Sequence, residues 1–198
     1  MTTTDHLAMH RHALGTASSF VERVGAADLM RPTPCAAWDL RLLLEHMLGQ
    51  HLGFIEVLRA GAAPAEAYRP VPFTLEAWHA SVDDLIAAFG AADLGATVVE
   101  VELHPTHPLP VAVLLAAQLL DTVVHTWDVA VALGATYAPP ADVADAVLAI
   151  AAPIPDDAGR DRPGAAFAHA VPSGDGTWER ALGLLGRDPR WTAARSTT

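Results

Sequence analysis

The feature that most restricts the fold of this chain is a polar stripe on a segment that otherwise has the pattern of an apolar helix. Residues 111–133 are mostly Val, Leu and Ala, but four polar residues fall within an arc of about a quarter turn: Gln118, Asp121, Thr122 and His125. A helix that is apolar nearly all round belongs at the centre of a bundle. The stripe therefore either lines the bundle interior or is the wet face of the helix, and the pattern alone leaves both open.

The composition narrows the class of protein. Hydrophobic residues make up 52% of the 198 residues, which argues against disorder, and the formal net charge of −11 argues against a nucleic-acid-binding surface. The N-terminus lacks the basic and apolar regions of a signal peptide, and Gln118 and Asp121 interrupt the apolar run well short of a membrane span. The single cysteine, Cys35, excludes an intramolecular disulfide. We therefore expect a cytoplasmic protein that binds neither nucleic acid nor membranes.

Hydrophobic periodicity predicts an almost entirely helical chain. Helices are expected at about residues 5–24, 40–59, 74–89, 111–133, 141–151 and 178–185, with Asp39 capping the second. Residues 97–102 fit a short strand or an extended connector. Four long helices with short or medium links indicate an all-α four-helix bundle at about residues 5–134. Residues 135–198 would extend it with short helices, so that residues 1–198 form a single domain.

His46, on the second predicted helix, adds a third candidate ligand to the polar stripe. It lies on the apolar side of that helix, where a lone histidine is usually a hydrogen-bonded core residue. Asp121 and His125, however, are an i, i+4 pair whose side chains project to the same side and can bind one ion. Two histidines and a carboxylate are the ligands of many zinc sites that keep a fourth position open.

Three segments, at residues 33–46, 121–130 and 184–189, together resemble a known family, the DinB-like metal-binding proteins. In the branch related to the N-terminal domain of mycothiol-dependent maleylpyruvate isomerase, a Thr-Pro-Cys-x-x-Trp-x-x-x-x-Leu-x-x-His signature matches the residues from Thr33 to His46. A second pattern, carboxylate-x-x-x-His-x-x-Asp-Leu-Ala, is similar to the segment from Asp121 to Ala130. The third match is Leu-Leu-Gly-Arg187-Asp-Pro near the C-terminus.

The resemblance implies an up-down-down-up bundle with a divalent metal, zinc or nickel, near one end. Carried over by position, the metal ligands are His46, Asp121 and His125. The isomerase has Glu where this chain has Asp121, which is one methylene shorter, so the metal would lie closer to the helix or be held through water. The isomerase also has a catalytic C-terminal domain, and this chain has only a short segment after Pro140, so isomerase activity itself is not implied.

Further polar residues have both a functional and a structural interpretation. Asp128, one turn after His125, could orient its ring or lie on the helix surface. Gln50, Gln118 and Thr122 could line the pocket, although polar filling of the core explains Gln50 equally well. The remaining candidates are interpreted structurally: His6 and His10 as a solvated pair, His104 and His107 as exposed loop residues, Cys35 as a small residue packed in a turn, and Trp38 and Trp127 as packing anchors.

The leading functional hypothesis is a metal-dependent enzyme that uses a low-molecular-weight thiol such as mycothiol. The thiol would attack a small electrophilic substrate, giving S-transfer, conjugation or isomerisation. One alternative is a non-catalytic protein that binds a divalent metal or small ligand. A third is a metal-assisted hydrolase, which the lack of a His-Glu-x-x-His motif disfavours. The many Ala and Leu residues also leave room for a homodimer formed through an apolar face.

Overall fold

The computed structural model describes residues 3–35, 38–104 and 106–193. Helices and strands follow one another as α1 (Thr3–Val21), α2 (Leu40–Ala60), η1 (Ala65–Tyr68), α3 (Leu75–Ala91), β1 (Thr97–Val98), β2 (Leu109–Pro110), α4 (Val111–Ala132), α5 (Ala141–Ala151), η2 (Ala158–Asp161) and α6 (Thr177–Leu184), where η marks a 3-10 helix. In this part of the chain, no helix combines the length and apolar character needed to cross a membrane. The all-α prediction is confirmed.

The helix boundaries follow local signals in the sequence. Asp39 caps α2 by accepting a hydrogen bond from the Leu42 amide at 2.8 Å, as predicted, and Gly61 ends the helix in the left-handed conformation that glycine favours (φ 82°). The first helix ends at Val21, three residues before its predicted end, because the amides of Arg23 and Val24 bond carbonyls three residues back in turns. Residues 97–102 form only the two-residue strand β1, which pairs with β2 in front of α4.

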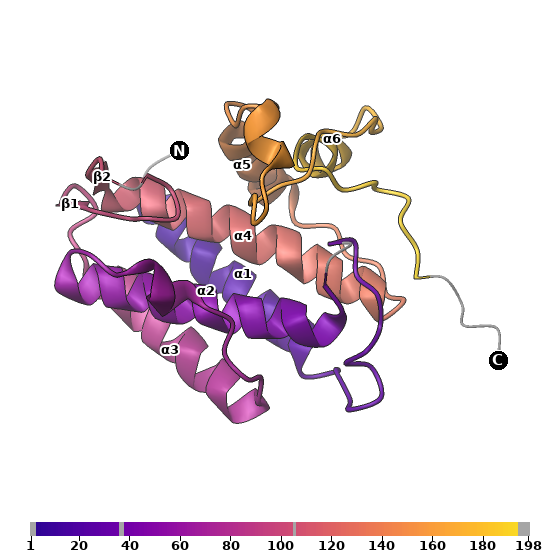
Figure 1. The fold of residues 1–198 in the computed structure, drawn as a ribbon, viewed down its shortest axis with the longest axis horizontal. Helices are drawn as coiled ribbons and strands as arrows, with labels where there is room; N and C mark the ends of the chain where they lie inside the picture. Colours follow the sequence, from indigo (N-terminus) through magenta and orange to yellow (C-terminus); the bar gives the residue numbers. More distant parts are fainter. Residues whose placement is uncertain (1–2, 36–37, 105, 194–198) are drawn as a thin grey trace.

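The four long helices form an up-down-down-up bundle (Figure 1). α1 and α4 run in the same direction. His10 of α1 bonds Gln118 of α4, and Phe20, further along α1, packs on Tyr137, which follows the end of α4. α2 and α3 both run the opposite way, and the link between them returns along α2, where the Val71 amide donates to the Glu45 carbonyl at 3.0 Å. The resemblance implied this topology, and the structure confirms it.

Two glycines of α2 let that returning link lie directly on the helix. A Cβ at Gly49 would overlap the backbone of Arg69, and a Cβ at Gly53 would overlap the ring of Tyr68. Tyr68 is buried there and donates a hydrogen bond to the buried carboxyl group of Glu100. The close approach of helix and link therefore depends on the missing side chains.

Gly53→Ala is expected to destabilise the protein by about 1–3 kcal/mol, because the ring of Tyr68 must move out of a packed position. Gly15 in α1 is the matched control, since a Cβ there meets no atom within 4 Å. Gly15→Ala should raise stability by about 0.5–1 kcal/mol through helix propensity. Urea unfolding of both variants checks the prediction, which fails if the two substitutions change the free energy of unfolding in the same direction.

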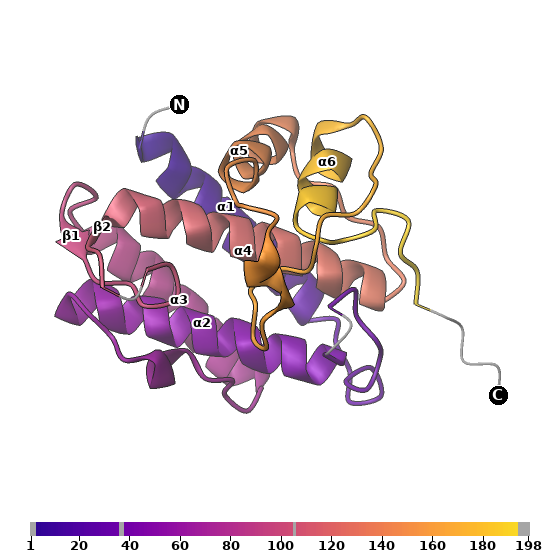
Figure 2. The same cartoon turned by 45° about the horizontal axis from the view of Figure 1, so that its top comes forward.

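The C-terminal extension packs on α4 on the side away from α2 (Figure 2). There, α5 and α6 bury a second apolar cluster that includes Leu120, Val124 and Trp127 of α4. Because α4 is shared by this cluster and by the bundle core, it is buried on nearly all sides, as its composition predicts.

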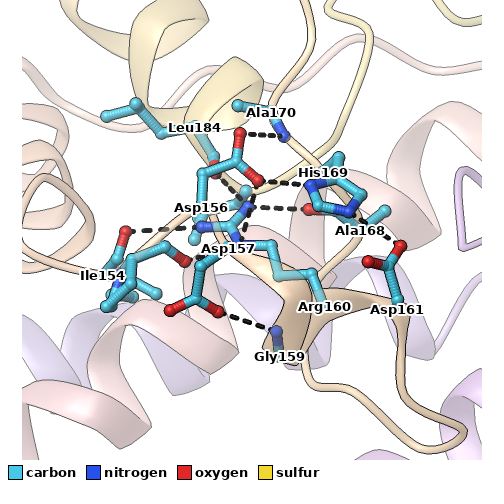
Figure 3. A network of polar contacts seen from close by, with 12 residues as sticks. Ile154, Asp156, Asp157, Gly159, Arg160, Asp161, Ala168, His169, Ala170 and Leu184 are labelled. Carbon is cyan, nitrogen blue, oxygen red and sulfur yellow. Dashed lines mark hydrogen bonds and ion pairs between the residues drawn. The ribbon is translucent and has the colours of Figure 1, made fainter.

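The long segment between α5 and α6 is held by Arg160 (Figure 3). Its guanidinium donates to the carbonyls of Ala168 at 2.7 Å, Leu184 at 2.8 Å and Pro155 at 2.8 Å. His169 lies between two carboxylates, with Nδ1 2.6 Å from Asp156 Oδ1 and Nε2 3.0 Å from an oxygen of Asp161. These contacts order a stretch that contains little regular secondary structure.

Candidate metal centre

The three residues proposed as metal ligands converge between α2 and α4. His46 lies in the second turn of α2, and Asp121 and His125 lie one turn apart on α4. One donor atom from each lies within 4.8 Å of the others. His125 is 5% exposed and Gln118 is fully buried, whereas the Asp121 side chain remains 26% exposed. The polar stripe therefore faces the bundle interior and reaches solvent at Asp121, so the interpretation as a wet face is wrong.

The distance between the two donor atoms on α4 suits neighbouring ligands of a tetrahedral ion. His125 Nε2 lies 3.3 Å from Asp121 Oδ1. Bonds of about 2.1 Å from zinc to nitrogen and oxygen place neighbouring tetrahedral ligands about 3.4 Å apart. The rings of His46 and His125 meet edge to face with centroids 5.3 Å apart, so both imidazoles border the same small space. An aspartate at position 121, although shorter than glutamate, therefore reaches this space.

The protonation of the three groups also suits a cation. Burial, together with the neighbouring His125, lowers the pKa of His46 to about 4, so His46 is neutral and its ring has a free lone pair. Burial would raise the pKa of Asp121, but the neighbouring histidines, His125 foremost, outweigh this effect and lower the pKa to about 2. Burial would lower the pKa of His125, yet Asp121 and Asp128 raise it well above its ordinary value. The carboxylates thus attract positive charge to this point, either a proton on His125 or a metal ion.

The other nitrogen of His125 is held by a buried ion pair. His125 Nδ1 lies 2.9 Å from Asp128 Oδ2, and the same oxygen accepts a hydrogen bond from Arg187 Nη2 at 3.2 Å. Asp128 is fully buried and Arg187 is 6% exposed. Arg187 also lies against Phe167, with Cζ 6.0 Å from the ring centroid, so the C-terminal extension reaches the centre through this residue. Asp128 therefore orients His125 rather than lying on the helix surface.

Cys35 and Trp38 complete the surroundings. The Cys35 thiol donates to Asp128 Oδ2 at 3.4 Å, and Arg187 Nη2 lies 3.0 Å from its sulfur. Although Cys35, His125 and Asp128 have the spacing of a second ligand set, the guanidinium of Arg187 contacts the sulfur and the carboxylate of this group and would repel a metal ion. The Trp38 ring packs against His46 with centroids 4.5 Å apart, so it is a packing anchor beside the centre.

From the sequence, Cys35 is interpreted only as a small residue packed in a turn, and Arg187 is given no role beside the centre. Both residues lie in motifs that carry the family resemblance, and this was the one signal that could have pointed to them. Helix periodicity and charge pattern cannot relate two residues that lie so far apart in the sequence. Trp127 lies outside the centre, on the side of α4 that packs against the C-terminal extension.

The predicted pocket residues take different places. Gln118 Oε1 accepts hydrogen bonds from His10 Nε2 at 2.9 Å and from the Thr122 hydroxyl at 2.7 Å. Gln50 is buried one turn after His46. The prediction of a solvated histidine pair on α1 is wrong for His10, which is 1% exposed because it shares the face of α1 that packs on α4. His104 and His107 are exposed, as predicted.

His10 gives the protein a predictable sensitivity to acid. Burial lowers the pKa of His10 to about 4, although the hydrogen bond to Gln118 partly opposes this. An unfolded chain binds this proton near pH 6.5, so between pH 6.5 and 4 the unfolded state holds more protons, and stability falls as the pH falls. Since one pKa unit corresponds to about 1.36 kcal/mol, the full loss from His10 approaches about 3 kcal/mol.

Urea unfolding at pH 7.5, 5.5 and 4.5 measures this loss. His10→Gln keeps a donor for Gln118 but removes the titrating group, so its stability should fall less steeply than that of the wild type. Parallel pH profiles for the two proteins would contradict the assignment to His10.

Comparison with protein families matches residues 10–130, more than half of the chain, to the mycothiol maleylpyruvate isomerase N-terminal domain. The chain belongs to this family. Two uncharacterized proteins of Mycobacterium tuberculosis, MT0763 and Rv0738, are each 31% identical to it over 140 residues, covering 66% of this chain and 68% of each relative. All three residues of the candidate centre lie within the matched family segment.

Solved structures agree on the fold of this family. The crystal structure of the mycothiol-dependent maleylpyruvate isomerase superposes with a TM-score of 0.61, and that of a histidine-to-alanine mutant with a TM-score of 0.62. Each covers 76% of this chain and 70% of the isomerase chain at 14% sequence identity, so the similarity is one of fold.

Proposed function

We propose that the protein is a divalent-metal-dependent enzyme that uses a low-molecular-weight thiol, such as mycothiol, on a small electrophilic substrate. The observation that carries this proposal is the convergence of His46, Asp121 and His125, with donor atoms within 4.8 Å of one another. Membership of a family described by mycothiol and maleylpyruvate isomerase supports the choice of thiol and of reaction class.

The donor set fits zinc, with nickel as the alternative. Two imidazoles and one carboxylate leave a fourth position for an exchangeable ligand. Zinc in such a set lowers the pKa of a bound thiol or water. His46 needs no deprotonation to act as a ligand, because burial already keeps it neutral. Asp121 would supply the negative charge, and its side chain is more exposed to solvent than that of His125.

The residues around these ligands have distinct roles in the proposed reaction. Asp128 accepts the Nδ1 proton of His125 and so leaves Nε2 directed at the centre. Arg187 keeps Asp128 ionised, since burial would raise its pKa but the guanidinium and His125 lower it. Trp38 packs against the ring of His46 and excludes water from that side.

The sulfur of the thiol would add to an electrophilic carbon of the substrate. Protonation of the neighbouring carbon, with the new carbon–sulfur bond retained, gives a conjugate, and departure of a leaving group from the attacked carbon gives S-transfer. Release of the sulfur after rotation about the former double bond gives cis–trans isomerisation, with the thiol regenerated. The same bound thiol serves all three outcomes, so the centre supports the reaction class, and the substrate decides which product forms.

The test compares zinc-loaded and metal-free protein with mycothiol and a panel of electrophiles that includes maleylpyruvate. We expect product formation that requires both thiol and zinc and that is lost in His46→Gln and Asp121→Asn. No rate above that of the metal-free protein for any pair would overturn the proposal. Zinc binding without turnover would instead favour a non-catalytic binding protein.

A further inference from the structure

A hollow lies on the opposite side of α4 from the candidate metal centre. Trp127 follows His125 by two residues, which turns its side chain about 200° around the helix axis. The hollow has a volume of about 480 Å³ and lies between the C-terminal half of α4, the link to α5, α6 and the segment after it. A volume of this size falls within the range of about 300–1,000 Å³ that small-molecule sites occupy.

Aromatic side chains are concentrated around this hollow. The chain has five tryptophans and two tyrosines, and the hollow is lined by three of the former and one of the latter: Trp127, Trp178, Trp191 and Tyr137. We call this the aromatic pocket. Its walls are held in place, since Trp127 is 4% and Trp178 is 8% exposed, and Tyr137 meets Trp178 edge to face with centroids 6.4 Å apart. Tyr137 is fixed from behind by Phe20, with centroids 5.6 Å apart.

The charges at the aromatic pocket favour a positively charged occupant. Arg190 lines the pocket, but its charge is compensated by Asp188, whose Oδ1 lies 3.1 Å from Arg190 Nε. Glu179 also lines the pocket, and within the described part of the chain it has no salt-bridge partner. The chain as a whole carries a net charge of −11. An anionic ligand would therefore meet a repelling field, whereas a cation would meet an attracting one.

We infer that the aromatic pocket binds a small organic cation with an alkylated ammonium group. The faces of Trp and Tyr rings attract such cations through their quadrupoles, and cages of several aromatic rings are the usual way proteins hold quaternary ammonium groups. The pocket offers four aromatic rings in one hollow of suitable volume, and Glu179, which has no salt-bridge partner among the described residues, is one of its lining residues. The site is separate from the metal centre, so it adds a binding function beyond the proposed reaction.

The test titrates the full-length protein with choline and with its uncharged carbon isostere, 3,3-dimethyl-1-butanol, while the five indole N–H signals are followed by NMR. Choline should shift the signals of Trp127, Trp178 and Trp191 in a saturable manner, and leave those of Trp38 and Trp78 unchanged as internal controls. The isostere should bind at least about tenfold more weakly, since it lacks the charge that the rings recognise.

Variants separate this inference from its alternatives. Trp191→Ala should abolish saturable binding, and Trp191→Phe, which keeps a ring, should retain it. His46→Gln should bind choline like the wild type, so failure of the proposed metal chemistry leaves this test unaffected. Equal affinity for choline and its isostere would overturn the inference, as would no saturable shift at tens of millimolar choline. Choline-independent dimerisation that is lost in Trp191→Ala would assign the pocket to a second copy and would also overturn it.

Discussion

Replacement of His125 by alanine is expected to lower the zinc content of the protein from about one equivalent to almost none. His125 lies next to both of the other candidate ligands. Its Nε2 is 3.3 Å from Asp121 Oδ1 on the same helix, and its ring packs edge to face against that of His46 on α2. Loss of an outer-shell partner typically costs about 10–100-fold in metal affinity, and loss of a ligand should cost more than that.

Two measurements on each variant check this expectation. Metal content is determined after dialysis, and the thermal midpoint is determined with and without added zinc. At a zinc concentration of about 100 times Kd, binding stabilises the folded state by about 2.7 kcal/mol. For a chain of this size that corresponds to an increase of roughly 5–10 °C in Tm, which the wild type should show and His125→Ala should not.

Controls distinguish loss of the ligand from loss of the fold. Asp121→Asn keeps the shape of the side chain and removes its charge, so it should fold normally and bind zinc weakly. His104→Ala removes an exposed loop histidine far from α2 in the sequence and should retain full zinc binding. Stoichiometric zinc in both His125→Ala and Asp121→Asn would place the metal elsewhere and contradict the candidate centre.

The candidate ligands could be predicted from the sequence because helix geometry relates them. Residues four apart on a helix must project to the same side, so Asp121 and His125 had to be neighbours once the helix was recognised. Only the meeting with His46 required the bundle, and the family resemblance supplied that. The bundle itself could be predicted because four long apolar patterns leave few other ways to bury their faces.

Of the residues behind the ligands, only Asp128 could be placed in this way, one turn after His125 on the same helix, whereas the contacts of Arg187 and Cys35 could not. Asp128 and Arg187 are 59 residues apart, and Cys35 and Arg187 are 152 apart, across loops that have no periodicity. His10 is different, because a signal was present. It lies three residues after Leu7 and four before Leu14, on the apolar face of α1, so burial followed from the spacing that identified the helix.

Arg187→Met is expected to destabilise the protein by about 3–5 kcal/mol, because it removes the guanidinium paired with the buried carboxylate of Asp128 and leaves only His125 to compensate that charge. Arg187 and Asp128 are both buried, and within the described residues Asp128 Oδ1 has no hydrogen-bond partner that could compensate. Arg190→Met is the matched control three residues away. Its partner is Asp188, but both side chains are largely exposed, and exposed pairs of this kind contribute about 0–1 kcal/mol.

The double variant Arg187→Met with Asp128→Leu separates the contribution of the ion pair to stability from its effect on the centre. Apolar replacement of both members of a buried pair is often neutral, so most of the lost stability should return. Zinc affinity should not return, because His125 Nδ1 has lost the acceptor that orients the ring, at an expected cost of about 10–100-fold. Urea unfolding measures the stability, and zinc titration measures the zinc affinity, of Arg187→Met, Arg190→Met and the double variant. Recovery of both would mean that Asp128 serves stability alone; recovery of stability without zinc affinity would show that the C-terminal extension supports the metal centre through Arg187 and Asp128.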